Sequence, residues 1–218
     1  MMALRALEIG DYLFDDALMA TARREQRAQH RVYCLQEPLV VLGRGSKVEA
    51  ELDVEACLKD GVAVVRRRGG GCAVVLDPGQ VVVSVALPAQ GIGDNKRYLD
   101  GLSRWLIAGL EGLGSKGIEQ AGISDLAQAG RKISGSCVHR SRDLLYYSAT
   151  LLMDPRVELM ARYLAHPPRE PDYRGARSHE AFVGRLHLPS FKTAEALQEA
   201  LATKLASSSL TPHIPGLR

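Results

Sequence analysis

The feature that most limits the possible folds is an apolar run that ends in a cluster of positive charge and glycine. Residues 62–65 have the β-branched content of a buried strand and lead directly into residues 66–71, three arginines followed by three glycines. Guanidinium groups beside backbone without side chains favour an anion site, because N–H groups can then approach a phosphate or carboxylate closely. A solvated basic turn has the same composition, so both interpretations stay open at this point.

The residues after this cluster exclude two common phosphate-binding motifs. No Gly-Lys-Ser/Thr follows the glycines, as a P-loop requires, and they lead into an extended run instead of the helix that a dinucleotide-binding fingerprint requires. Residues 73–76 and 81–87 are apolar and flank Asp77, Pro78 and Gly79. We therefore expect a hairpin of two antiparallel strands, with Pro78 fixing its φ and Gly79 supplying a positive φ in the turn.

Helical and extended patterns alternate along the chain, which predicts an α/β fold. Helical spacing occurs over residues 12–26, 54–59, 96–113, 157–164 and 194–205. Extended segments cover residues 32–41, 123–126, 132–138 and 144–153, and the last three should form a meander that returns to one sheet. No long linker or repeat is visible, so we assign residues 1–190 to one catalytic domain and residues 191–218 to a C-terminal helix and polar tail.

Composition narrows the class of protein. The chain has 218 residues with 46% hydrophobic content, and Lys+Arg 28 against Asp+Glu 25 is too balanced to indicate nucleic-acid binding. Its apolar runs are far shorter than the roughly 20 residues that cross a bilayer. The N-terminus lacks the pattern of a signal peptide, so a cytoplasmic location away from membranes is expected. The four cysteines are widely spaced, without a zinc-binding pattern.

A second segment, SDLAQAGRKISGSCVHR at residues 124–140, carries a lysine between glycines. Lys132 lies between Gly130 and Gly135 at the start of an extended run, so its ammonium can point into a site with little side-chain bulk around it. Asp125, across the turn at residues 129–130, can face the same cavity and pair with the lysine or bind a metal. Taken alone, Lys132 is a surface charge and Asp125 an ordinary edge-strand acid.

Together, RRRGGGCAVVLDPGQ at residues 66–80 and the segment at residues 124–140 resemble the lipoate-protein ligase A and octanoyltransferase family, which shares its fold with biotin-protein ligases. Family ligases carry a pattern like R-R-x-S-G-G-G-A-V-x-H-D-x-G-N, followed by N-D-I, G-R-K-I-S-G-S and H-H-G-T-L-L. This chain has a counterpart of each in the same order, over roughly residues 13–153. The resemblance implies a class II biotin/lipoyl-ligase-like catalytic domain, α/β (α+β), with a mostly antiparallel mixed sheet flanked by helices.

The resemblance also implies a site. Lys132 would be the catalytic residue, its charge stabilising negative charge on the carboxylate and the α-phosphate during adenylation. Arg67 with Gly69, Gly70 and Gly71 would hold the phosphate and carboxyl of lipoyl-adenylate. The remaining residues implied at the adenylate site are Cys72, Val74, Gln80, Ser124, Asp125, Gly135, Ser136, Ser148 and Thr150. Val83 and Val85 would line a tunnel for the acyl chain or pack in the core.

The chain departs from the family pattern around the acyl pocket. Gly69 stands where the family has serine, Cys72 replaces the third glycine, Leu76 replaces the histidine before the turn, and Tyr147, Ser148 and Ala149 replace H-H-G. The preference for lipoate or octanoate therefore stays open.

The first functional hypothesis from this resemblance is an ATP-dependent ligase that forms lipoyl-AMP with Mg²⁺ and attaches lipoate to a carrier lysine. The carrier would be an E2 domain, a glycine-cleavage H protein or a lipoate-binding protein of sulfur metabolism. The residues after 153 look too few for the C-terminal domain of longer ligases, so a separate accessory subunit is a further candidate partner.

Two other hypotheses remain. An octanoyl or lipoyl transferase with an acyl-carrier donor would need Cys72 or Cys137 as nucleophile, because neither family cysteine position is filled here. The altered segment at residues 147–149 is the basis for a non-catalytic binder of lipoyl carrier domains.

Overall fold

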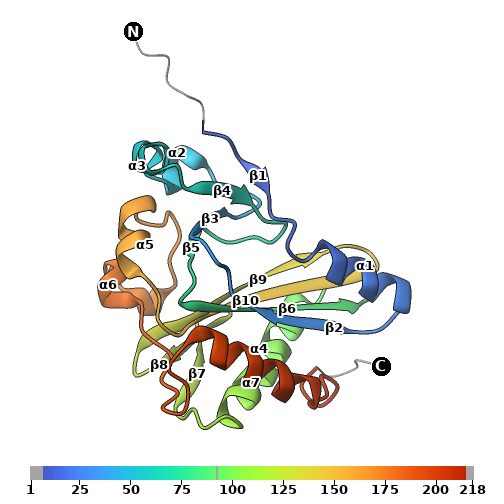
Figure 1. The fold of residues 1–218 in the computed structure, drawn as a ribbon. Helices are drawn as coiled ribbons and strands as arrows, with labels where there is room; N and C mark the ends of the chain where they lie inside the picture. The colour runs from blue at the N-terminus through green and yellow to red at the C-terminus, as the bar shows by residue number, and fades with distance from the viewer. Residues whose placement is uncertain (1–6, 92, 215–218) are drawn as a thin grey trace.

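The computed structural model describes residues 7–91 and 93–214, and its strands form two sheets (Figure 1). The larger sheet has six strands in the order β2-β6-β10-β9-β8-β7, and all of its pairs are antiparallel. Its strands are β2 (Gln29–Tyr33), β6 (Gln80–Pro88), β10 (Leu144–Leu152), β9 (Arg131–Arg140), β8 (Asp125–Gln128) and β7 (Ile118–Ala121). The meander of β8, β9 and β10 confirms the sequence prediction, whereas β7 had no expected counterpart.

The smaller sheet has four strands in the order β1-β4-β3-β5. The β1–β4 and β4–β3 pairs are parallel and the β3–β5 pair is antiparallel. Its strands are β1 (Gly10–Asp11), β4 (Ala63–Arg66), β3 (Leu39–Leu42) and β5 (Val74–Leu76). The predicted α/β fold, with mostly antiparallel strands flanked by helices, is confirmed.

Helices cover the outer faces of the sheets (Figure 1). Helix α4 (Asn95–Glu111) and helix α7 (Ala194–Ala206) lie beneath the six-stranded sheet and share one apolar core with it, in which Leu197, Leu201 and Leu205 are buried. On the small sheet are α2 (Val48–Glu51) and α3 (Val54–Asp60), while α1 (Asp16–Glu25) lies against β6, β2 and β10. Helices α5 (Val157–Tyr163) and α6 (His179–Phe182) and the short 3₁₀ helix η1 (Asp172–Arg174) complete the described elements.

Alternation along the strands separates the two faces of the large sheet. In β10, Leu145, Tyr147, Ala149 and Leu151 belong to the core shared with α4 and α7. Tyr146, Ser148 and Thr150 therefore face the opposite side, toward the small sheet. In β6, Val81, Val83, Val85 and Leu87 point to the helices in the same way. The large sheet thus offers one apolar face to the helices and a more polar face to the small sheet.

The expected hairpin of residues 73–76 and 81–87 is wrong. β5 pairs with β3 in the small sheet, whereas β6 pairs with β2 and β10 in the large one. The buried carboxylate of Asp77 accepts hydrogen bonds from the backbone N–H groups of Gly79 (2.8 Å) and Arg156 (3.0 Å), which anchors the chain where it passes between sheets. Gly79 has no positive φ; it is required because a Cβ there would lie 1.9 Å from the carbonyl oxygen of Asp154.

None of the helices within residues 7–91 and 93–214 is long and apolar enough to cross a membrane.

Replacing Gly79 by alanine should destabilise the protein, because the new Cβ would force the backbone away from Asp154. We expect the free energy of unfolding, measured in urea, to fall by about 2 kcal/mol or more. Gly45→Ala is the matched control, since a Cβ at that position meets nothing within 4 Å. Equal unfolding midpoints for the two variants would contradict this account of the turn.

Candidate active site

Residues of both sheets line a cavity of about 990 Å³. Val41 of β3 and Val74 and Leu76 of β5 contribute from the small sheet, and residues of β6, β9 and β10 contribute from the large one. This volume suits a ligand the size of an acyl-adenylate, since ligand pockets commonly measure roughly 300–1,000 Å³.

The structure brings most of the residues selected from the sequence to this cavity. Those on its wall are Arg67, Gly71, Cys72, Val74, Gln80, Ser124, Asp125, Lys132, Gly135, Ser136, Ser148 and Thr150. Gly69 and Gly70 belong to the same loop but do not line it. The tunnel role considered for Val83 and Val85 is wrong, because both side chains are fully buried in the core on the helix side of β6.

Lys132 and Asp125 form an ion pair on the cavity wall. The Lys132 Nζ lies 2.8 Å from Asp125 Oδ1, and the two side chains are 26% and 15% exposed. Gly135 makes room for this pair, because a Cβ there would lie 3.0 Å from the Lys132 Nζ. The backbone of Lys132 is held separately, since its carbonyl accepts a hydrogen bond from the N–H of Gly184 at 2.7 Å. The ammonium is thus fixed in position without being fully withdrawn from solvent.

Arg67 shapes the glycine-rich loop from within. Its Nη2 donates to the carbonyl oxygens of Gly70 (2.7 Å) and Cys72 (2.8 Å), and its Nη1 donates to that of Val41 (3.1 Å). Arg66 holds the adjoining turn in the same way, with Nη1 donating to the carbonyl oxygens of Gly43 (2.8 Å) and Ser46 (3.0 Å). In this structure both guanidinium groups organise backbone around the cavity.

A buried carboxylate ties this turn to the loop. Glu51, only 5% exposed, accepts hydrogen bonds from the Ser46 Oγ (2.9 Å) and the Ala73 N–H (2.6 Å). The two backbones also touch, since a Cβ on Gly43 would lie 1.9 Å from the Gly71 carbonyl oxygen. Gly71 itself has φ +91, a conformation that residues with a Cβ rarely adopt. These contacts fix the path of the loop beside the cavity.

Cys137 gives a physical reason for one departure from the family pattern. A Cβ at position 69 would lie 2.6 Å from the Cys137 Sγ, so glycine is needed where the family pattern has serine. Burial raises the pKa of the Cys137 thiol, and the nearby Arg67 only partly opposes this effect. Cys137 is therefore a neutral thiol at physiological pH.

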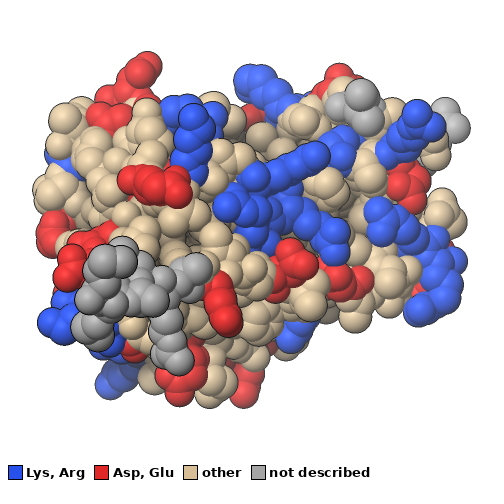
Figure 2. Space-filling model, turned by 90° about the horizontal axis from the view of Figure 1, so that it is seen from above, with Lys and Arg blue, Asp and Glu red and all other residues tan. Residues whose placement is uncertain are grey.

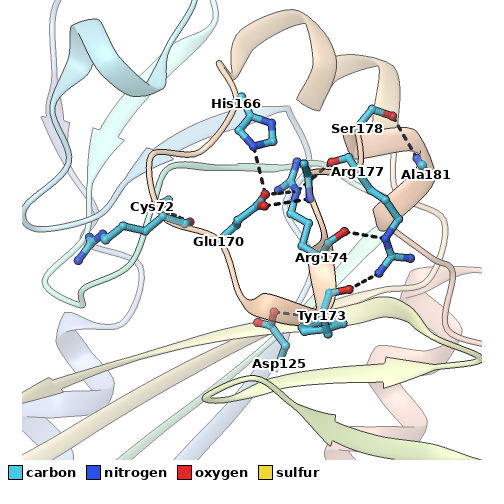
Figure 3. A network of polar contacts seen from close by, with 11 residues as sticks. Cys72, Asp125, His166, Glu170, Tyr173, Arg174, Arg177, Ser178 and Ala181 are labelled. Atoms are coloured by element: carbon cyan, nitrogen blue, oxygen red, sulfur yellow. Dashed lines mark hydrogen bonds and ion pairs between the residues drawn. The ribbon is translucent and has the colours of Figure 1, made fainter.

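A segment that the sequence analysis left without a role closes one side of the cavity. Residues 165–177, called the strap below, place Tyr173 above the large sheet with its hydroxyl donating to Asp125 Oδ2 at 2.9 Å (Figure 3). Further cavity-lining residues of the strap are Ala165, Pro167, Arg169, Glu170, Pro171, Asp172 and Arg174. Both oxygens of Asp125 are thus engaged, one by Lys132 and one by Tyr173.

Arg174 is a second residue of the strap whose side chain could contact a ligand. Its guanidinium is almost fully buried, 4.9 Å from the ring of Phe182 and 3.3 Å from Glu170. Its Nη2 has no hydrogen-bond partner among the described residues. A buried N–H donor on the wall of a cavity can bind an oxygen of an anionic ligand. The Pro/Arg/His-rich composition of this stretch was the available signal, but it did not identify the residue.

Positive charge also gathers outside the cavity. Figure 2 shows Lys and Arg side chains clustered across the middle of the face seen from above. Arg44, Arg68 and Arg23 lie near His139, whose pKa is lowered mainly by burial and then by these three charges. The Arg44 N–H donates to the carbonyl of Gly69 at 2.9 Å, so this basic surface adjoins the glycine-rich loop. Such a surface attracts anionic ligands toward the site.

The residues of the cavity could bind Mg²⁺ only if a bound phosphate supplied some of its ligands. Within the described parts of the chain, no group of three or more His, Cys, Asp or Glu side chains could hold a metal ion. A single carboxylate such as Asp125 suffices when substrate phosphates and water supply the other ligands, as is common for Mg²⁺.

Comparison with known proteins agrees with the resemblance found in the sequence motifs. The model of the lipoyl protein ligase A/B catalytic domain matches residues 10–206. A lipoate–protein ligase of Streptococcus pyogenes is 31% identical over 155 residues, which are 71% of this chain and 44% of that protein. The octanoyltransferase LipM of Carboxydothermus hydrogenoformans is 29% identical over 79% of this chain and 71% of its own length. The chain spans about half the length of the curated ligases it matches.

Solved structures support the fold. A bi-partite lipoate protein ligase of Thermoplasma acidophilum, described with its E2 lipoyl domain, has a TM-score of 0.71 at 20% identity and covers 91% of this chain and 80% of its own. A lipoate-protein ligase A bound with ATP also has a TM-score of 0.71, at 19% identity, over 88% of this chain and 76% of that one. Because the family model covers residues 10–206, well over half of the chain, the protein belongs to the lipoyl protein ligase A/B catalytic domain family.

Proposed function

We propose that the protein is an ATP-dependent lipoate–protein ligase that forms lipoyl-AMP and transfers the lipoyl group to a lysine of a carrier protein. The observation that carries this proposal is that the ammonium of Lys132 and the glycine-rich loop at Gly71 line one cavity. The curated lipoate–protein ligases among the relatives and the ATP-bound structural neighbour support it. The reaction requires ATP, and we propose a cytoplasmic location as well.

In the first step, a carboxylate oxygen of lipoate attacks the α-phosphorus of ATP, and pyrophosphate leaves with the electron pair of the broken P–O bond. Negative charge then increases on the oxygens between the two substrates. Lys132 would stabilise this charge with a fixed ammonium, and backbone N–H groups near Gly71 would bind the phosphate oxygens. Arg174 would add its unpartnered Nη2 from the strap.

In the second step, the ε-amine of the carrier lysine attacks the carbonyl carbon of the mixed anhydride. AMP leaves with the electron pair of the C–O bond, and the amine releases a proton to solvent. Lys132 would polarise the carbonyl during this attack. Mg²⁺, with Asp125 as one ligand, would neutralise charge on the phosphates.

The partner in this proposal is a lipoyl carrier. The T. acidophilum ligase is described with its E2 lipoyl domain, which supports a carrier of that kind; an H protein or a sulfur-metabolism lipoate-binding protein are further candidates. The same ligase is described as bi-partite, which supports an accessory subunit as a second candidate partner.

The second candidate function is acyl transfer from an acyl-carrier donor through a cysteine thioester. The octanoyltransferase LipM among the relatives, and the presence of Cys72 and Cys137 on the cavity wall, favour it. The raised pKa of Cys137 argues against that residue, because a thiolate is the reactive form. This leaves Cys72 as the better nucleophile for a transferase.

Lys132→Ala should abolish adenylation while leaving the fold intact. We expect lipoate-dependent exchange of pyrophosphate into ATP to fall about 100-fold or more, because a fixed charge facing the reacting oxygens is lost. Lys59→Ala, at an exposed lysine of α3, is the control and should exchange like the parent. Exchange by Lys132→Ala at the parent rate would refute the assignment. A parent protein that binds carrier but neither exchanges nor modifies it would instead support a non-catalytic binder.

A mass measurement separates ligase from transferase. After incubation with octanoyl carrier protein and no ATP, the intact protein should show no acyl adduct, and Cys72→Ser should still lipoylate a carrier with ATP and lipoate. An octanoyl adduct that disappears in Cys72→Ser would favour the transferase.

A further inference from the structure

The cavity has a polar end that the proposed reaction does not use. A buried carboxylate, Asp15, is surrounded there by hydroxyl groups from β2, β6, β10 and the chain before α1. This hydroxyl cluster consists of Tyr12, Asp15, Tyr33, Ser84, Tyr146 and Ser148. Tyr12, Tyr146 and Ser148 line the cavity, whereas Asp15 is only 2% exposed and lies behind them.

Three hydroxyl protons point directly at Asp15. Its Oδ2 accepts hydrogen bonds from the hydroxyls of Tyr146 (2.6 Å), Ser84 (2.8 Å) and Tyr33 (2.9 Å). A carboxylate has no proton to return, so the three hydroxyls must be the donors. Burial raises the pKa of both tyrosines, so they keep these protons at physiological pH.

The other two hydroxyls bond to the same cluster. The hydroxyl oxygens of Tyr12 and Tyr33 are 2.7 Å apart, and because the Tyr33 proton goes to Asp15, Tyr12 must be the donor. The Oγ atoms of Ser84 and Ser148 are 3.3 Å apart. Ser84 is the donor in that pair too, so its one proton is shared between Asp15 and Ser148, and the Ser148 Oγ is an acceptor.

The hydroxyl protons of Tyr12 and Tyr146 therefore point away from the cavity. On the cavity side these two tyrosines are left with oxygen lone pairs, which only accept hydrogen bonds, whereas Ser148 keeps its own proton. The second oxygen of Asp15, Oδ1, has no partner in the described residues, so the unused acceptors of the cluster outnumber its one unused donor, the Ser148 hydroxyl. A ligand that fills this end with methylene groups would bury acceptors without partners, which costs free energy.

The distance from the Lys132 amine to the cluster is about the length of an acyl chain. The Lys132 Nζ lies above Gly135. Ser148 pairs with Cys137 and Tyr146 pairs with His139, two and four residues beyond Gly135 along β9. At a rise of about 3.3 Å per residue, these positions are about 7 and 13 Å from Gly135. An extended chain that runs along β9 from a carboxyl at Lys132 would thus end beside the cluster.

We propose that this end of the cavity selects acids whose far end donates a hydrogen bond, such as a hydroxyl or a thiol, over acids that end in a methyl group. The orientation of the acid rests on the proposed function, in which Lys132 binds the carboxyl. For lipoyl substrates, the reduced dithiol is then preferred over the closed dithiolane, which has no donor.

The test compares two acids with the same number of non-hydrogen atoms, nonanoate and 8-hydroxyoctanoate. Titration calorimetry with the full chain and no ATP gives both dissociation constants. In an apolar pocket nonanoate would bind more tightly, because the buried hydroxyl would lose its water. We expect the reverse, with 8-hydroxyoctanoate about 3- to 10-fold tighter, as for one net hydrogen bond.

The variants remove cavity-facing acceptors without touching the bonds to Asp15. The preference is the dissociation constant of nonanoate divided by that of 8-hydroxyoctanoate. In the double variant Tyr12→Phe, Ser148→Ala, this ratio should fall to about one-third of the parent value or less. Tyr147→Phe is the matched control, because that side chain points from β10 to the opposite face, and its preference should equal the parent's.

Each outcome bears on one proposal or both. Nonanoate binding at least as tightly as the hydroxy acid in the parent would overturn the inference, as would an unchanged preference in the double variant. If ATP-dependent lipoylation persists in either case, the proposed function stands without it. Binding of neither acid would overturn the inference, whereas the proposed function is tested separately by lipoate-dependent pyrophosphate exchange.

Discussion

Lys132 and Asp125 form an ion pair 2.8 Å long on the wall of a cavity, and the architecture around it depends on keeping that pair there. A half-buried ammonium without a partner would be costly, and Asp125 offsets this cost until an anionic substrate arrives. Tyr173 holds the other oxygen of Asp125, so the strap and the Lys132 ammonium share one carboxylate. The Lys132–Asp125 pair is therefore satisfied within the protein, and in the proposed function substrate phosphates and carboxylate would replace contacts of this pair.

Close backbone approaches explain why glycine recurs around this site. Gly43 lies against the carbonyl of Gly71, Gly69 against Cys137, and Gly135 beneath the Lys132 side chain. Each position would bring a Cβ to 3.0 Å or less from its neighbour. The glycine-rich loop thus owes its shape to packing, with Arg67 bonded to its carbonyls. No backbone hydrogen bond among the described residues is donated by the N–H groups of residues 69–72, so these groups can bind an anion.

Most of the residues selected from the sequence lie on the cavity wall, but they leave out its closure and, apart from Ser148, its polar end. Lys132, Asp125 and Arg67 were recognisable because each lies in a motif whose spacing carries the chemistry. Tyr173 and Arg174 lie in an irregular stretch with no periodicity, so only the tertiary fold brings them to the cavity. Val83 and Val85 were ambiguous because nearly all of β6 is buried on both faces, which removes the alternation that would distinguish them. The hairpin prediction failed for a related reason, since a turn sequence does not determine which strands its neighbours pair with.

The central claim is that an acyl-adenylate lies between Lys132 and the glycine-rich loop. A crystal structure of the protein with a non-hydrolysable sulfamate analogue of lipoyl-adenylate tests this most directly. The account predicts that the analogue's acyl carbonyl or sulfamate oxygens accept a hydrogen bond from the Lys132 Nζ, with backbone N–H groups of the loop near Gly71 on the other side. An analogue bound outside this cavity, or inside it without contact to either group, would contradict the account.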